Sequence, residues 1–254
     1  MKKISRSYKT EAVVLNVRNL SEKDRIATLI TPTYGKLDVV VKGSKKLTGK
    51  ISAHFEPINR LFLMISSGRN LDVVSQSELL FAFPVIRSSL SLSASALYLA
   101  DLVNRKTEKG QENRPLFRLF LSSLNMLEKE VSPAVVIQSF CLKLITVMGY
   151  RPTLDRCILC GKSGQFNLFD FSHSGLICPG CSGKTKKSNC ISLSPGAVST
   201  IIFLEKAGGA QISRLKPERT IMSDVEKFTR QYIKYHLTGT SVEDDKYKKL
   251  LSNE

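Results

Sequence analysis

The sequence predicts an α+β multidomain protein, in which an N-terminal OB-fold β-barrel is followed by an all-α helical domain carrying an inserted four-cysteine zinc ribbon. Three observations predict this fold class. Short segments rich in Val, Ile, Leu and Thr fill residues 1–80, apolar residues recur at helical spacing from residue 84 onward, and two Cys-x-x-Cys pairs lie near each other. The length of 254 residues suits one to two domains. We therefore expect a barrel domain over residues 1–80 and a helical domain over 81–254, with the ribbon at about 155–185.

Five segments of the first 80 residues have the composition of β-strands. They are Glu11–Val17, Arg25–Thr31, Lys36–Lys42, Asn59–Ile65 and Asn70–Gln76. In the third segment Leu37, Val39 and Val41 stand two positions apart, as expected when one face of a strand is buried. Five short strands with one long connection, residues 43–58, fit a small OB-like barrel, and an SH3-like barrel fits the same pattern.

From Pro84 the apolar residues change to the helical period of about 3.6. We expect five main helices, of which the first covers Pro84–Arg105 and the others begin near Pro115, Ser132, Ser194 and Ser223. The helix that begins after Ser132 is apolar on every side, so it should be the central buried helix. For the last helix, Ser223 and Glu226 have the spacing of a capping box at its start.

Four cysteines form two Cys-x-x-Cys pairs separated by seventeen residues, which is a zinc-site spacing. The ligands are Cys157, Cys160, Cys178 and Cys181. Four thiolates complete a tetrahedron around one Zn²⁺ ion per chain, so the site should be structural, whereas a zinc hydrolase would need an open metal position. Gln165–Phe171 and Leu176–Ile177 are strand-like and would form the hairpin of the ribbon. Gly161, Gly180 and Gly183 allow the left-handed backbone that such turns often need.

The formal net charge is +16, and residues 1–50 alone contribute +8, from 12 basic and 4 acidic side chains. A basic excess of this kind favours phosphate polymers as partners, although a solvated basic surface would also account for it. We find no nucleophile elbow, P-loop or Gly-rich dinucleotide motif, so we expect no enzyme. No apolar stretch reaches membrane-spanning length, and the paired cysteines fit a reducing compartment, so we expect a cytoplasmic protein.

Several short motifs occur in an order that resembles the bacterial RecO family of DNA repair and recombination mediators. They are Tyr8–Leu15, Glu22–Arg25 with Leu29–Thr31, Gly35–Leu37, Val41–Gly43, Gly149–Pro152 just before Cys157, the two cysteine pairs, and Tyr232–Leu237. The resemblance implies an N-terminal OB fold, a helical C-terminal domain and a non-enzymatic protein that binds single- and double-stranded DNA and anneals complementary strands. It also implies a role in loading RecA onto gaps coated by single-stranded-DNA-binding protein. The implied partners are RecR and the C-terminal tail of that coating protein, and the implied location is the bacterial nucleoid.

Candidate DNA contacts follow from the resemblance together with charge, because OB folds bind single strands by a basic groove and aromatic faces. They are Arg25, Lys36, Lys42, Lys45, Lys46 and Lys50, with Tyr34 as a stacking platform. Of the basic residues, only Arg25, Lys36 and Lys42 fall on family-like motifs. For each lysine taken singly, a solvated surface charge is an equally good interpretation. The alternative function is a zinc-ribbon transcription or translation factor, which would bind a specific sequence or RNA.

Overall fold

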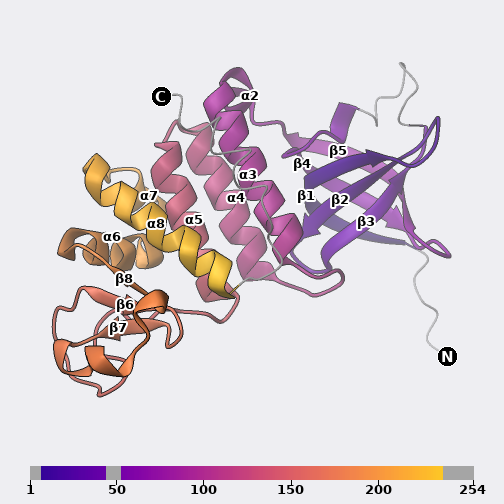
Figure 1. The fold of residues 1–254 in the computed structure, drawn as a ribbon. Coiled ribbons are helices and arrows are strands. Elements are labelled where there is room, and N and C mark those ends of the chain that lie inside the picture. Colours follow the sequence, from indigo (N-terminus) through magenta and orange to yellow (C-terminus); the bar gives the residue numbers. More distant parts are fainter. Residues whose placement is uncertain (1–6, 44–52, 237–254) are drawn as a thin grey trace. The chain divides into compact units, whose positions relative to one another are not determined.

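A computed structural model describes residues 7–43 and 53–236 of the chain. The chain divides after Glu130 into two units, each of which is described by itself. The first unit contains the N-terminal β-sheet and helices α2 to α4, within residues 84–128, and the second contains helices α5 to α8, within residues 133–236, and the cysteine pairs (Figure 1). A sheet-rich N-terminal region followed by a helical region is thus confirmed.

Five strands of the first unit form a closed barrel in the order β1-β2-β3-β5-β4 (Figure 1). They are β1 (Ser7–Asn19), β2 (Arg25–Thr31), β3 (Gly35–Val41), β4 (Arg60–Ser66) and β5 (Asp72–Phe81). All five predicted strands are present. β1 is longer than predicted because its first half pairs with β4 and its second half with β2, which extends it over polar residues at both ends.

The barrel interior is built from apolar side chains at alternate strand positions, because successive residues of a strand face opposite sides. The buried cluster comprises Ala12, Val14, Ala27, Leu29, Val39, Val41, Phe55, Leu61, Leu63, Ile65 and Val74. The alternation of Leu37, Val39 and Val41 therefore marks the inward face of β3, as the sequence predicts.

Helices of the same unit as the barrel include α2 (Pro84–Ser88), α3 (Leu90–Lys106) and α4 (Arg114–Glu128). They pack there because the outward faces of β1 and β2 are apolar too, with Val13, Leu15, Ile26 and Ile30 all buried. α3 contacts β1, and α4 contacts β2. The compact unit therefore extends to Glu130, beyond the barrel limit expected near residue 80.

The segment between α3 and α4 also extends the sheet along the edge of β3. Lys109 forms a parallel bridge with Lys36, and the Gly110 N–H donates to the Lys36 carbonyl at 3.0 Å. Gly35 has a φ of +62°, and a Cβ there would lie 1.8 Å from the carbonyl oxygen of Gln111. Only glycine fits at this position, so the contact between the barrel and the helices is built into the sequence.

The prediction of one helix over Pro84–Arg105 is wrong in one respect, because this segment forms two helices, α2 and α3. Ser89 is extended, with φ −121° and ψ 128°, and ends α2. Its side chain then accepts a hydrogen bond from the Leu92 N–H and caps α3. A serine hydroxyl competes for backbone groups and favours such caps over helix interiors.

The second unit contains α5 (Pro133–Val147), α6 (Pro195–Lys206), α7 (Gly209–Ile212) and α8 (Arg219–His236), with a small sheet ordered β7-β6-β8. The sheet strands are β6 (Leu168–Asp170), β7 (Gly175–Ile177) and β8 (Cys190–Ser192). α5 contacts α6, α7 and α8 and buries ten of its fifteen residues, which confirms it as the central helix of this unit.

The predicted start of the last helix at Ser223 is wrong. The Met222 N–H already donates to the Glu218 carbonyl at 3.0 Å, and α8 begins at Arg219. Ser223 lies inside the helix, because the apolar residues Ile221 and Met222 precede it and extend the helix toward its N-terminus. No helix among the described residues is long and apolar enough to cross a membrane.

Candidate metal centre and nucleic-acid interface

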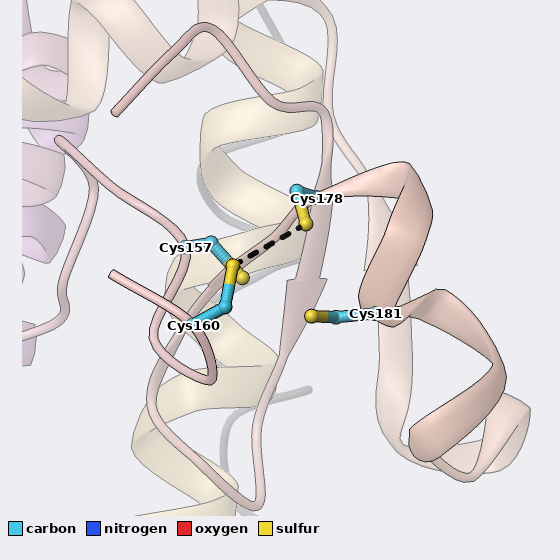
Figure 2. Close-up of side chains that lie close together, drawn as sticks. All are labelled: Cys157, Cys160, Cys178 and Cys181. Carbon is cyan, nitrogen blue, oxygen red and sulfur yellow. Dashed lines mark hydrogen bonds between the residues drawn. The ribbon is translucent and has the colours of Figure 1, made fainter. Parts of the chain in front are cut away.

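The four predicted cysteine ligands converge in the second unit. Their sulfur atoms all lie within 4.8 Å of one another, and three of the four residues are buried (Figure 2). The Sγ atoms of Cys160 and Cys178 are 3.7 Å apart. Two Zn–S bonds of about 2.3 Å at a tetrahedral angle would place their sulfurs about 3.8 Å apart. The cluster could therefore hold one tetrahedral metal ion.

The two Cys-x-x-Cys turns achieve this convergence differently. In the first, the Gly161 N–H donates to the Cys157 carbonyl at 2.9 Å, and Gly161 is left-handed with φ +73°, as predicted. In the second, the chain enters a 3₁₀ turn, η1 (Pro179–Lys184), and the Cys181 N–H donates to the Cys178 carbonyl at 2.9 Å. The prediction of left-handed backbone at Gly180 and Gly183 is wrong, because a 3₁₀ turn has right-handed dihedral angles.

The thiols differ in acidity. Burial of Cys157 opposes its ionisation, but hydrogen bonds from nearby backbone N–H groups outweigh burial and lower its pKa to about 6. Hydrogen bonding to Cys178, together with burial, raises the pKa of Cys181 to about 12. All four groups can be thiolates together only when a cation balances their charge. Four thiolates leave no position for water or substrate, so a metal bound here would be structural.

Residues 155–192, which contain the four cysteines and strands β6 to β8, are called the cysteine ribbon. Aromatic contacts attach this ribbon to α8. The ring centroid of Phe169, in β6, lies 4.9 Å from that of Phe228 and 5.6 Å from that of Tyr232. The Tyr232 hydroxyl donates to the Tyr150 carbonyl at 2.9 Å, just before the first cysteine pair. These contacts bring the segments around Tyr150 and Tyr232 together beside the cysteines.

Two of the candidate DNA contacts lie together at one end of the barrel. Arg25 is the first residue of β2 and pairs with Val41, the last residue of β3, so Lys42 follows directly beside it. The Asp24 carboxylate accepts a hydrogen bond from the Gly43 N–H at 2.9 Å, which holds this end together. Lys42 is exposed and Arg25 half-buried, and neither forms an ion pair within the described residues. Lys45, Lys46 and Lys50 lie outside the described residues.

Lys36 has a different environment. Its Nζ donates to the backbone carbonyl of Asn104, in α3, at 2.6 Å, and burial lowers the pKa of this ammonium group. Tyr34 lies in the β2–β3 turn, at the opposite end of β2 from Arg25, and its ring centroid is 4.5 Å from that of Tyr8. The structure therefore brings neither Lys36 nor Tyr34 to the end of the barrel that carries Arg25 and Lys42.

The outward face of β2 and β3 is covered within the first unit. The Asp38 side chain is 7% exposed, and its carboxylate accepts hydrogen bonds from Thr28 and Lys109, each at 2.7 Å. Arg18 adds a longer ion pair to Asp38 at 3.7 Å. The predicted DNA contacts did not include Lys23, which is exposed in the β1–β2 turn. Its position two residues before Arg25 could have suggested it as a further candidate.

Comparisons with known proteins agree along the whole described chain. Residues 1–83 match the family described as Recombination protein O N terminal, and residues 87–243 match Recombination protein O C terminal. A protein named DNA repair protein RecO from Caldanaerobacter subterraneus subsp. tengcongensis is 32% identical over 91% of this chain and 94% of its own length. Its namesake from Thermoanaerobacter sp. is 31% identical, over 91% and 93%. The one from Bacillus pumilus is 34% identical, over 74% and 73%.

Proposed function

Because the chain belongs to the RecO family of DNA repair and recombination proteins, we propose that it is a non-enzymatic recombination mediator. It binds single- and double-stranded DNA and anneals complementary strands. With RecR, it helps to load RecA onto gaps coated by single-stranded-DNA-binding protein. The observation that carries this proposal is a pair of cations, Arg25 and Lys42, that form no ion pair among residues 7–43 and 53–236 and lie at one end of a closed five-stranded barrel.

The barrel is proposed to be an OB fold. Its order places β5 between β3 and β4, with β3 parallel to β5, which supports a Greek-key barrel over an up-and-down barrel of consecutive strands. OB folds commonly bind oligonucleotides over strands 2 and 3 and the adjoining loops. Helices α3 and α4 cover the outer face of β1 and β2 here, so the DNA path is assigned to the end formed by the β1–β2 turn and Lys42.

The remaining candidates are assigned from their charge, their position in the sequence or their contacts. Lys23 joins Arg25 and Lys42, and Lys45, Lys46 and Lys50 continue the basic segment in sequence. Lys36 is assigned to the contact between barrel and α3. Tyr34 lies at the opposite end of β2 and packs against Tyr8, so it is not assigned to this DNA path.

The metal is proposed to be Zn²⁺, one per chain, held by Cys157, Cys160, Cys178 and Cys181. Thiolate-only tetrahedral sites suit zinc, and the ion would fold the ribbon without taking part in a reaction. The acidic tail of the single-stranded-DNA-binding protein is proposed to dock on the helical region. The reason is charge, because 24 of the 38 Lys and Arg residues follow residue 80. Cross-linking a tail peptide to the full chain should label helical residues, and labelling confined to the barrel would contradict this.

A strand-annealing assay tests the proposed function. The full chain should accelerate annealing of complementary oligonucleotides, both naked and coated by single-stranded-DNA-binding protein, for unrelated sequences alike. Annealing of neither substrate would refute the mediator function. Binding confined to one sequence or to RNA would instead favour the alternative of a transcription or translation factor.

A further inference from the structure

Three lysines project from one short turn of the cysteine ribbon. Lys184, Lys186 and Lys187 are all exposed, and no ion pair of theirs occurs in the part of the chain that the structure describes. Residues 156–190 contain five basic side chains and one acidic side chain, Asp170. That carboxylate is 1% exposed and already accepts hydrogen bonds from Ser172 and His173. We call residues 182–189 the lysine turn.

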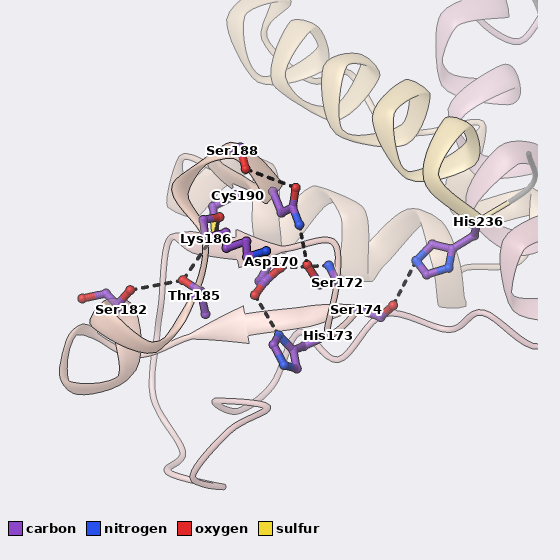
Figure 3. A network of polar contacts seen from close by, with 11 residues as sticks. Asp170, Ser172, His173, Ser174, Ser182, Thr185, Lys186, Ser188, Cys190 and His236 are labelled. Atoms are coloured by element: carbon purple, nitrogen blue, oxygen red, sulfur yellow. Dashed lines mark hydrogen bonds and ion pairs between the residues drawn. The ribbon is translucent and has the colours of Figure 1, made fainter.

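Hydrogen bonds hold the backbone of the lysine turn in place (Figure 3). The Thr185 hydroxyl donates to the Ser182 carbonyl at 3.1 Å, and the Asn189 N–H donates to the Lys186 carbonyl at 2.9 Å. The Asn189 side-chain amide then donates to the Ser172 hydroxyl at 2.9 Å, next to the β6–β7 turn. The turn also follows Cys181 directly, and the Cys181 N–H donates to the Cys178 carbonyl at 2.9 Å. The three ammonium groups are therefore presented from an ordered loop.

Several other basic residues of the same unit have a partner within it. Arg151 pairs with Glu205 at 2.8 Å, and Arg230 forms an ion pair with Glu226 one helical turn away. The Lys143 ammonium donates to the Ala207 carbonyl at 2.6 Å. The lysine turn differs because it places three cations within four residues and contains no carboxylate. The three positive charges repel one another, and a bound polyanion would offset this repulsion.

The chemistry of the surface identifies the kind of polyanion. Protein partners anchor through exposed aromatic or large apolar side chains. No large apolar side chain is exposed between residues 179 and 190, whereas the hydroxyl residues Ser182 and Ser188 are exposed. Lysine and hydroxyl groups are typical ligands of phosphate oxygens in a nucleic-acid backbone, which carry no sequence information.

We propose that the lysine turn is a second DNA-binding surface, which holds the backbone of one strand while the barrel end holds another. This inference rests on the proposed annealing function, because annealing requires two strands to be held together. It adds that each unit of the chain binds one strand, and that the metal-held ribbon contributes through Lys184, Lys186 and Lys187.

The test compares two triple variants of the full chain. One is Lys184→Ala/Lys186→Ala/Lys187→Ala. The matched control is Lys206→Ala/Lys216→Ala/Lys234→Ala, which removes the same charge from exposed positions of the same unit. Metal content and circular dichroism confirm that both variants are folded. Energy transfer between two labelled, non-complementary oligonucleotides then reports whether one chain holds both, and the annealing rate is measured in parallel.

The lysine-turn variant should bind the first strand as the wild type does but the second at least tenfold more weakly. The slope of log affinity against log salt for the second strand should become shallower by about 2, because each of the three lost phosphate contacts accounts for about 0.7. The control should keep both properties. Equal behaviour of the two variants would overturn the inference alone. Loss of tail-peptide binding with unchanged second-strand binding would overturn it in favour of a protein partner. A wild type that binds no strand would refute the proposed function itself.

Discussion

The barrel and the cysteine ribbon are both β-structures, yet different forces stabilise them. The barrel strands have seven to thirteen residues and enclose eleven buried hydrophobic residues. The ribbon strands have three residues each, and three of the four buried residues in its cluster are cysteines. Strands so short bury too little apolar surface to offset the entropy of ordering the chain. A bound metal can supply in the ribbon what hydrophobic burial supplies in the barrel.

Removing the metal should therefore have the largest effect and should separate the two regions most clearly. Cys157→Ser/Cys178→Ser should lose the ion and unfold the ribbon, because structural zinc contributes on the order of 10–16 kcal/mol of apparent binding free energy. Metal analysis and hydrogen exchange measure this, with fast exchange over residues 155–192 and unchanged protection in the barrel. Cys190→Ser is the matched control and should retain one ion per chain. Zinc still bound by the double variant would show that these cysteines are not the ligands.

A cavity in the barrel should affect only the first unit. Leu63 is completely buried, so Leu63→Ala should cost about 2–5 kcal/mol of unfolding free energy. Denaturant unfolding measures this cost, and metal content reports on the ribbon, which should keep its ion. Loss of metal from this variant would mean that the two regions are not stabilised separately.

Asp38 in the first unit and Asp170 in the second are carboxylates with buried side chains. In both, burial opposes ionisation but hydrogen bonds outweigh it and lower the pKa, mainly from Lys109 to Asp38 and from His173 to Asp170. A folded-state pKa below the unfolded value of about 3.9 means that the stabilisation is present above that pH. It is lost as the pH falls through the folded-state pKa.

Asp38→Asn and Asp170→Asn should each cost about 1–3 kcal/mol of unfolding free energy at pH 7. Unfolding at pH 7 and near pH 3 measures the change, and the gap between variant and wild type should narrow at the lower pH. Asp38→Asn should weaken the first unit and Asp170→Asn the second, as hydrogen exchange can distinguish. A penalty of the same size at both pH values would show that the carboxylate charge is not its source.

The smallest expected effect concerns DNA affinity at the barrel end. Arg25→Ala/Lys42→Ala should make the slope of log single-strand affinity against log salt shallower by about 1.4, because each of the two lost phosphate contacts accounts for about 0.7. Lys36→Ala is the control, and it should lower stability but leave the slope unchanged, because its ammonium group is bound to the Asn104 carbonyl. Salt titration of both variants measures the difference. A slope altered by Lys36→Ala alone would return the DNA path to the outer face of β3.

The sequence by itself determined the features that local patterns encode. The spacing of the cysteines predicted that their four sulfur atoms would converge, and strand periodicity predicted the inward positions of β3, such as Val39 and Val41. The apolar character of residues 133–147 predicted the central helix of the second unit. These predictions hold because ligand spacing and side-chain periodicity depend on neighbours within a few residues.

Only the tertiary structure decided which basic groups are available to a ligand and where the first unit ends. Lys36 resembles Lys42 in sequence, but its ammonium group meets a carbonyl 68 residues away. Helices α3 and α4 join the barrel because the outward side chains of Val13 and Ile30 need cover, which strand periodicity does not reveal. The physical reason is that burial and charge pairing are set by which distant segments meet, since the hydrophobic effect is non-directional and does not depend on sequence separation.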